Sequence, residues 1–134
     1  MVKRYFIYGT LGWLIEVLWT GLGSLIKGQL TLESRTYLWM FPIYGLAVFL
    51  EFIHDEIREY KWWVRGLVYM CLIFLIEYLA GYFLEALVGR CPWDYSGKHF
   101  SVNGYIRLDY APVWFMAGLI FEQIHDRIMN EWVR

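Results

Sequence analysis

The sequence predicts an all-α fold, an integral membrane antiparallel four-helix bundle built from two repeated helical hairpins. Three observations support this prediction. Apolar residues make up 59% of the 134 residues, aromatic residues make up 21%, and the charged residues gather between long apolar stretches. Soluble domains contain roughly 45–50% apolar residues. Apolar stretches joined by charged connections, with aromatic residues near their ends, are typical of a multi-pass membrane protein.

Four spans are predicted, over about residues 5–26, 37–54, 64–88 and 110–128. A bilayer core needs about 20 helical residues, so each span is long enough to cross it or nearly so. Pro42 and Pro112 lie near the starts of the second and fourth spans. We expect one membrane domain over residues 1–134, with an outer loop over about residues 89–107 that is long for a connection in a bundle.

The two halves of the chain repeat each other. Leu-Ile-Glu occurs at residues 14–16 and again at 75–77, and Glu-x-x-His-Asp occurs at residues 51–55 and 122–126. The repeat unit is a hairpin of two helices, which returns the chain to its starting side of the membrane. We therefore expect two parallel repeats related by an axis along the membrane normal.

The distribution of charge predicts orientation and excludes one class of partner. Seven Lys and Arg residues, Arg134 among them, lie at the termini and in the middle connection, against five in the other two connections. By the positive-inside rule, both termini are expected in the cytoplasm. The net charge of −1 argues against nucleic acid as a partner. Cys71 and Cys91 give no disulfide framework.

Every span carries a glutamate, and two of the four glutamates begin a Glu-x-x-His motif. The order along the chain is Glu16, then Glu51 with His54, then Glu77, then Glu122 with His125. Ferritin-like four-helix dimetal proteins have ligands in this order. In an up-and-down bundle the six side chains are able to meet, because residues three apart share a helix face. Together they would suit a pair of iron, manganese or zinc ions.

Other interpretations of these acids stay open. Glu16 and Glu77 lie in the middle of spans, and with Glu85 they predict a buried polar core that serves as a proton or substrate site. Alternatively, Glu16 and Glu77 bond facing polar side chains and fix the packing of the helices. Glu51 and His54 precede a charged segment, so they also fit the point where a helix leaves the lipid.

The outer loop is a second candidate site. Its notable residues are Trp93, Asp94, Tyr95, Ser96, Asn103 and Arg107. In one interpretation the loop caps the outer end of the bundle, and Asp94 caps a turn. In the other it is a lid over a polar cavity above Glu16 and Glu77. Arg35 and Arg107 would then neutralise those acids or bind an anionic head group.

Several motifs resemble one membrane family. They are Cys-Pro-Trp-Asp-Tyr-Ser at 91–96, Asn-Gly at 103–104, Leu-Asp-Tyr-Ala-Pro-Val-Trp at 108–114, Pro-Ile-Tyr-Gly at 42–45 and Glu-Tyr-Leu-Ala-Gly at 77–81. The family is the four-pass ABC-transporter type IV (CmpB-like) family, and the chain is most similar to its transmembrane protein 229 branch. The resemblance covers nearly the whole chain and implies a fold and a membrane location. Where the bacterial pattern has an arginine after the Asn-Gly turn, this chain has Tyr105, and Arg107 follows two residues later.

Three functions fit these features. The first is a transport or permease-type component in the lipid bilayer, either a homo-oligomer or working with a separate ATPase subunit, because the chain has no phosphate loop. The second is a membrane-embedded dimetal oxidoreductase or metal-binding protein. The third is a non-catalytic scaffold or lipid-binding protein. No nucleophile motif such as Gly-x-Ser-x-Gly occurs, so the sequence does not predict catalytic residues.

Overall fold

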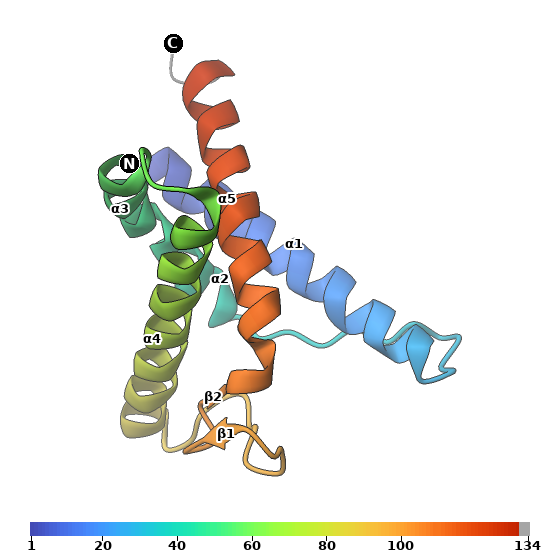
Figure 1. Cartoon of the computed structure of the whole chain (residues 1–134). Helices are drawn as coiled ribbons and strands as arrows, with labels where there is room; N and C mark the ends of the chain where they lie inside the picture. Colours follow the sequence, from blue (N-terminus) through green and yellow to red (C-terminus); the bar gives the residue numbers. More distant parts are fainter. Residues whose placement is uncertain (132–134) are drawn as a thin grey trace. The chain divides into compact units, whose positions relative to one another are not determined.

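The computed structural model describes residues 1–131 (Figure 1). The helices are α1 (Val2–Ile26), α2 (Met40–Gly45), the 3-10 helix η1 (Leu46–Phe49), α3 (Leu50–Ile57), α4 (Trp62–Val88), the 3-10 helix η2 (Leu108–Tyr110) and α5 (Ala111–Glu131). Two short strands, β1 (Ser101–Val102) and β2 (Ile106–Arg107), lie between α4 and η2. The predicted all-α class is confirmed. Arg134, which was counted for the orientation, lies outside the described residues.

The four predicted spans correspond to helical segments with adjusted ends. The first, third and fourth match α1, α4 and α5. The second, predicted over residues 37–54, is a run of three helical pieces from residue 40 to residue 57, because the 3-10 helix η1 separates α2 from α3. The last piece, α3, extends into the charged segment that the sequence had suggested as a connection.

Two of the described helices, α1 and α4, are long and apolar enough to cross a membrane, with mean hydropathies of 1.3 and 2.0. Much of their apolar surface faces outward, including Leu18 of α1, which is 66% exposed, and Leu87 of α4, which is 81% exposed. Large exposed apolar patches are unusual on a soluble monomer. Lipid is a suitable environment for such surfaces.

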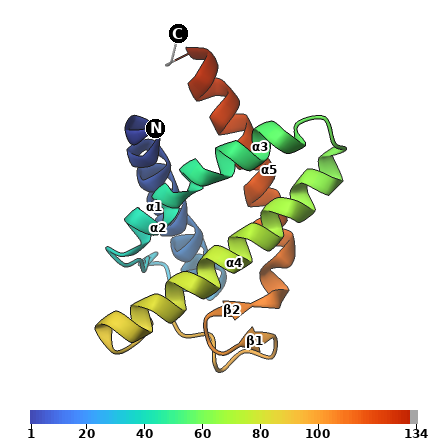
Figure 2. The same ribbon diagram turned by 90° about the vertical axis from the view of Figure 1, so that its left-hand side faces the viewer.

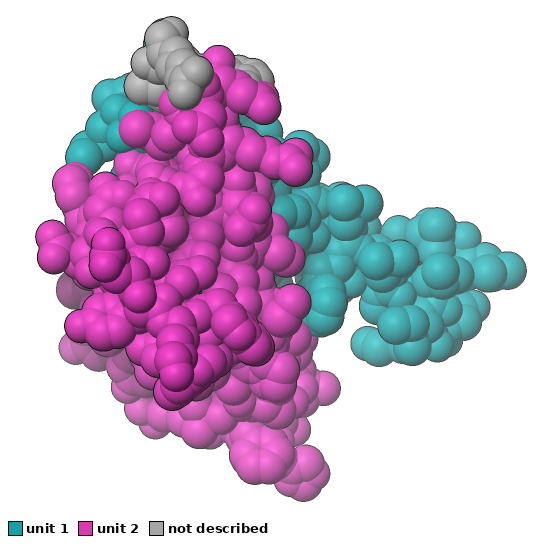
Figure 3. Space-filling view, turned by 45° about the horizontal axis from the view of Figure 1, so that its top comes forward, with its two compact units in different colours: residues 1–50 teal, residues 51–134 magenta. Residues whose placement is uncertain are grey.

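The chain divides into two compact units, residues 1–50 and residues 51–134 (Figure 3). In the first unit, α1 packs against α2 and η1. Gly12 faces the Tyr44 ring so closely that a Cβ atom there would lie 2.5 Å from Tyr44 Cγ, and Gly45 faces Tyr5 in the same way. The Tyr5 hydroxyl donates a hydrogen bond to the Pro42 carbonyl at 3.2 Å. Small residues therefore allow close contact between these helices.

In the second unit, α4 packs against α5 (Figure 2). Gly118 of α5 lies against Tyr69 of α4, and Gly66 of α4 lies against the Phe115 ring of α5. Tyr69 is completely buried. At the other end, α4 stops at Gly89, whose φ of +95° is a left-handed conformation that ends helices readily.

The outer loop contains a small β-hairpin. Strands β1 and β2 pair antiparallel, with Ser101 opposite Arg107 and Val102 opposite Ile106. Asn103, Gly104 and Tyr105 connect the strands, and the first two have positive φ values of 53° and 75°. Asn and Gly are the residues that adopt positive φ most readily, so they suit this tight connection. This hairpin gives the loop a fixed shape over the end of α4.

Candidate functional site

Four acidic or histidine side chains are buried among the described residues. They are Glu51, His54, Glu122 and His125, which are 2–5% exposed. They are the acids and imidazoles of the two Glu-x-x-His motifs. The first pair belongs to α3 and the second to α5, and all four residues lie in the second unit. Burial of ionisable groups is costly unless they have partners, so their contacts decide what the site is.

The two motifs are paired reciprocally. His54 Nδ1 lies 3.5 Å from Glu122 Oε1, and His125 Nδ1 lies 3.4 Å from Glu51 Oε1. Each imidazole therefore faces the carboxylate of the other motif. The two rings are 5.3 Å apart between centroids and nearly perpendicular, at 85°. This arrangement needs one acid and one histidine on the same face of each helix, and the three-residue spacing provides it.

Helix α4 adds two side chains to this centre. Arg65 Nε donates to Glu122 Oε1 at 2.7 Å, and Arg65 Nη2 donates to Glu122 Oε2 at 3.2 Å. The two bonds form a forked pair between guanidinium and carboxylate, the strongest common geometry for such ions. The Tyr69 hydroxyl lies 2.8 Å from His54 Nδ1. Arg65 and Tyr69 are one turn apart on α4, so both project toward the same region.

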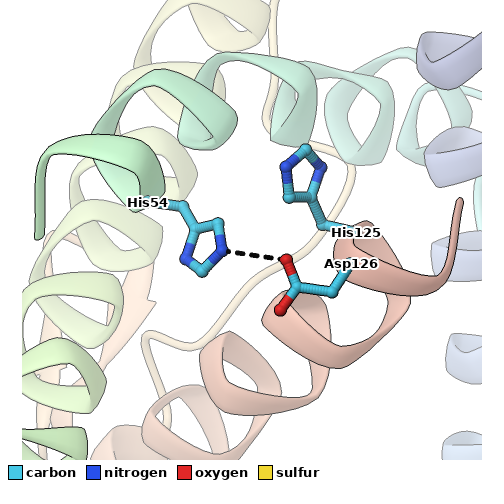
Figure 4. Close-up of side chains that lie close together, drawn as sticks. All are labelled: His54, His125 and Asp126. Atoms are coloured by element: carbon cyan, nitrogen blue, oxygen red, sulfur yellow. Dashed lines mark hydrogen bonds and ion pairs between the residues drawn. The ribbon is translucent and has the colours of Figure 1, made fainter. Parts of the chain in front are cut away.

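A third carboxylate lies at the edge of the centre. Asp126 Oδ1 is 3.3 Å from His54 Nε2, and the Asp126 side chain is 40% exposed. The dashed line in Figure 4 marks this contact. Arg58 Nη2 lies 3.3 Å from the same oxygen and 3.4 Å from Asp55 Oδ1. Asp126 therefore connects the buried histidines with the surface.

Glu77 and Glu85, also on α4, contact the outer loop. The Tyr95 hydroxyl donates to Glu77 Oε1 at 3.0 Å, and the Tyr105 hydroxyl donates to Glu85 Oε2. Glu77 is eight residues beyond Tyr69, about 12 Å along the helix at 1.5 Å per residue. The hydrogen bond from Glu85 raises the pKa of Tyr105 to about 12, because the neutral phenol is the donor.

The loop is stabilised by further bonds of its own. The Trp93 indole donates to the Tyr105 carbonyl at 2.8 Å, and the Asn103 amide donates to the Tyr78 hydroxyl at 2.8 Å. Asp94 Oδ1 accepts from the Ser96 backbone N–H at 2.9 Å, which is the turn cap that the sequence suggested. Hydrogen bonds from Ser96 hold the pKa of Asp94 below its usual value.

The two arginines that were considered as partners for Glu16 and Glu77 have other contacts. Arg107 forms a forked pair with Asp109, at 2.9 and 2.6 Å, and its guanidinium lies 4.3 Å from the centroid of the Tyr110 ring. Arg35 is exposed, and its backbone N–H donates to Thr20 Oγ1 at 3.0 Å.

Glu16 belongs to the first unit. Its Oε2 accepts a hydrogen bond from Thr36 Oγ1 at 2.6 Å. Within the second unit, the structure thus brings together four of the six predicted ligands, Glu51, His54, Glu122 and His125, and places Glu77 against the loop.

Sequence reasoning missed three members of the centre: Arg65, Tyr69 and Asp126. A signal existed for Asp126, because it follows His125 directly and lies four residues after Glu122, on the same helix face. Arg65 was counted only as a cytoplasmic charge. Its position in the first turn of an apolar helix gave no sign of a partner 57 residues away.

These features define a class: a small helical protein with two helices of membrane length and a buried centre of carboxylates, imidazoles and a guanidinium. The chain belongs to the family described as "Putative ABC-transporter type IV", whose model matches residues 4–134. The family predicted from the outer-loop motifs is therefore confirmed, while the transmembrane protein 229 branch stays a prediction. No solved structure matches the chain.

Family membership and the two apolar helices are consistent with a membrane protein of the transport type.

Proposed function

We propose that this chain is a four-pass integral membrane component of a transport system, with both termini in the cytoplasm. Its polar site would be the centre formed by Glu51, His54, Glu122 and His125. The observation that carries the proposal is the reciprocal pairing of the two Glu-x-x-His motifs at distances of 3.4 and 3.5 Å, with all four side chains buried.

The energetic argument starts from the cost of burial. Ionisable residues within membrane segments are expensive, and they usually mark ion or proton pathways or substrate sites. A scaffold would be equally well held by apolar residues of similar volume, since such replacements are often neutral or stabilising. Two motifs of the same form, each completing the other, therefore support a functional centre over a packing device.

The source of energy would lie outside the chain. The sequence contains no Gly-x-x-x-x-Gly-Lys phosphate loop, so ATP hydrolysis would require a separate subunit. Alternatively, an ion gradient would drive the movement. Carboxylates and imidazoles are the side chains that most often accept and release protons in proteins, which makes the proton the natural probe of this site. A single small bundle leaves little room for a pathway, so we expect a homo-oligomer or a partner subunit.

Proton flux into proteoliposomes tests the transport function. The protein is reconstituted, a potassium diffusion potential is imposed, and an entrapped pH-sensitive dye reports proton entry. We expect flux with the wild type and a fall to the level of protein-free vesicles for Glu51→Gln and Glu122→Gln. Glu131→Gln is the matched control for Glu122→Gln, because Glu131 is an exposed acid in the last turn of α5, the helix that contains Glu122.

Size-exclusion profiles would show that the variants are folded. Wild-type flux equal to that of empty vesicles, or unchanged flux in both Gln variants, would overturn the transport proposal in favour of a scaffold.

The orientation is tested separately by labelling. Cys71 and Cys91 are replaced by serine, and single cysteines are introduced at Lys98 in the outer loop or at Glu59 in the connection between α3 and α4. A membrane-impermeant maleimide should label intact cells at position 98 and label position 59 only after the cells are opened. The reverse pattern, or equal labelling at both positions, would contradict cytoplasmic termini.

A further inference from the structure

One ring nitrogen from each of two histidines and one carboxylate oxygen lie close together in the second unit. Ligand atoms from His54, His125 and Asp126 are all within 4.8 Å of one another (Figure 4). Two histidines and one carboxylate are the ligand set of several catalytic zinc sites and of non-haem iron(II) sites. This set differs from the six ligands expected from the sequence, because Asp126 replaces the glutamates.

Glu51 and Glu122 lie near the Nδ1 atoms of the two histidines. His54 Nδ1 faces Tyr69 at 2.8 Å and Glu122 at 3.5 Å, while His125 Nδ1 faces Glu51 at 3.4 Å. Histidines that bind a metal through one nitrogen usually donate the N–H of the other to a carboxylate or another acceptor, which fixes the ring and its tautomer. Both rings therefore have, beside Nδ1, the kind of orienting partner that metal-binding histidines need.

We propose that His54 Nε2, His125 Nε2 and Asp126 bind one divalent first-row transition-metal ion, such as Zn²⁺, with Glu51 and Glu122 orienting the two histidines. This inference rests on the proposed function, because it names the class of ion that the proposed transport centre would bind. Its binding test is nevertheless independent of transport. The proposed site holds one ion instead of the pair predicted from the sequence, and it involves neither Glu16 nor Glu77.

The geometry requires small movements. Tetrahedral Zn²⁺ with bonds of about 2.0–2.1 Å places its ligand atoms about 3.4 Å apart. The 3.3 Å between His54 Nε2 and Asp126 Oδ1 already meets this value. The other separations, at most 4.8 Å, must close by up to about 1.4 Å to match that tetrahedral spacing.

Arg58 must give way, because its Nη2 lies 3.3 Å from the same Asp126 oxygen. Its side chain is 52% exposed and also contacts Asp55, so it is able to turn toward solvent at little cost. A cation already occupies the outer side of Asp126 in this structure, and the metal ion would replace that charge.

Zn²⁺ binding to the full-length, detergent-purified protein tests the proposal by isothermal titration calorimetry. We expect one equivalent of Zn²⁺ per chain. Asp126→Asn should weaken binding at least about tenfold, because it removes the charged ligand from a partly exposed position where a folding defect is not expected. Glu51→Gln and Glu122→Gln should weaken it by about 10–100-fold, as losses of orienting partners do.

Two matched variants control for non-specific binding. Asp55→Asn removes the other carboxylate that contacts Arg58, and His99→Ala removes the third histidine of the chain, which lies in the outer loop. Both should bind Zn²⁺ as the wild type does. Co²⁺ provides a second readout, because visible absorption of the bound ion reports nitrogen and oxygen ligation and should be lost in His54→Gln and His125→Gln.

The possible outcomes separate the two proposals. Absence of Zn²⁺ binding in both detergent and lipid nanodiscs, or equal binding by Asp126→Asn and the wild type, would overturn the metal site, even if proton flux persists. Binding of one Zn²⁺ with the expected losses, in a protein that shows no proton flux, would support the metal site and contradict proton transport.

Discussion

Both units contain a helical hairpin in which glycines lie against aromatic rings, but they treat their glutamates differently. In the first unit, Glu16 accepts a hydrogen bond from the hydroxyl of Thr36 at 2.6 Å. In the second unit, Glu122 is held by a forked bond to Arg65 and lies 3.5 Å from His54. The first acid has a neutral hydroxyl partner here, whereas the second belongs to a network of ionisable groups.

Close packing of helices does not by itself produce a centre of charged side chains. A hydroxyl provides one hydrogen bond, whereas a guanidinium provides a full compensating charge in a fixed geometry. The second unit also contains Glu51 and His54, which belong to the short helix α3. Only the first residue of that helix, Leu50, belongs to the first unit. The additional helix is what converts a hairpin into a charged centre.

The largest expected effect is the loss of Arg65. Arg65→Met keeps most of the apolar stem but leaves Glu122 as a buried charge without its guanidinium, and breaking such a pair typically costs about 3–5 kcal/mol. We expect this loss in the free energy of unfolding, measured by denaturant titration in detergent micelles. The double variant Arg65→Met/Glu122→Gln should recover a large part of it, because no charge is then left behind. A double variant as unstable as the single one would mean that Arg65 acts through packing.

The next effect tests the packing of glycines against aromatic side chains, which occurs within each unit. Gly118→Ala places a methyl group against Tyr69 Cβ, an atom next to the backbone that cannot move cheaply. Overpacking of this kind costs about 1–3 kcal/mol. Gly23→Ala in α1 is the matched control, because no atom lies within 4 Å of a Cβ atom there, and it should be neutral or slightly stabilising. Equal unfolding midpoints for the two variants would contradict close packing between α4 and α5.

Much of the fold was predictable because its main signal is local. Long apolar stretches fix α1, α4 and α5 to within a few residues, and the Asn103-Gly104 pair marks the hairpin turn. The break between α2 and α3 was not predictable in this way, because the residues of η1 are as apolar as those of a regular helix. The motif Glu-x-x-His was also found by its local spacing, and it identified the four buried acids and histidines of the described centre.

The composition of the centre was only partly predictable, because it depends on contacts between distant parts of the chain. The prediction of a bundle with two repeats placed six residues together. In the second unit, however, Glu77 accepts a hydrogen bond from Tyr95 of the outer loop. Arg65 and Glu122 are 57 positions apart, and nothing in the spacing of either residue indicates the other. Such pairings follow from helix packing, which a single sequence does not specify.

A smaller effect is expected for the hydrogen bond between Thr36 and Glu16 in the first unit. Thr36→Val removes the hydroxyl that bonds Glu16 while keeping the shape of the side chain, and the loss of such a bond costs about 1–2 kcal/mol. We expect a decrease of that size in the free energy of unfolding, clearly below the effect of Arg65→Met under the same conditions. Thr36→Ser, which keeps the hydroxyl, is the control. A loss for Thr36→Val as large as that for Arg65→Met would remove the distinction between the two units.

The smallest effect concerns a charge pair at the surface of the second unit. Arg107 bonds Asp109 at 2.9 and 2.6 Å and holds the pKa of that carboxyl below its usual value of 3.8. A lowered pKa contributes stability above the unfolded value, and that contribution is lost as the pH falls through the folded value. The thermal midpoint of Asp109→Asn should therefore lie slightly below that of the wild type at pH 7, and the difference should vanish as the pH falls through the lowered pKa of Asp109.

Salt separates this pair from the buried one. Asp109 is 35% exposed on its side chain, whereas Glu122 is 5% exposed. Screening at 1 M salt acts over about 3 Å and weakens exposed pairs much more than buried ones. The difference between Asp109→Asn and the wild type should shrink in high salt, while the loss in Arg65→Met should persist. If salt removed both effects equally, Arg65 and Glu122 would be accessible to solvent, and the second unit would hold an exposed charge cluster instead of a buried centre.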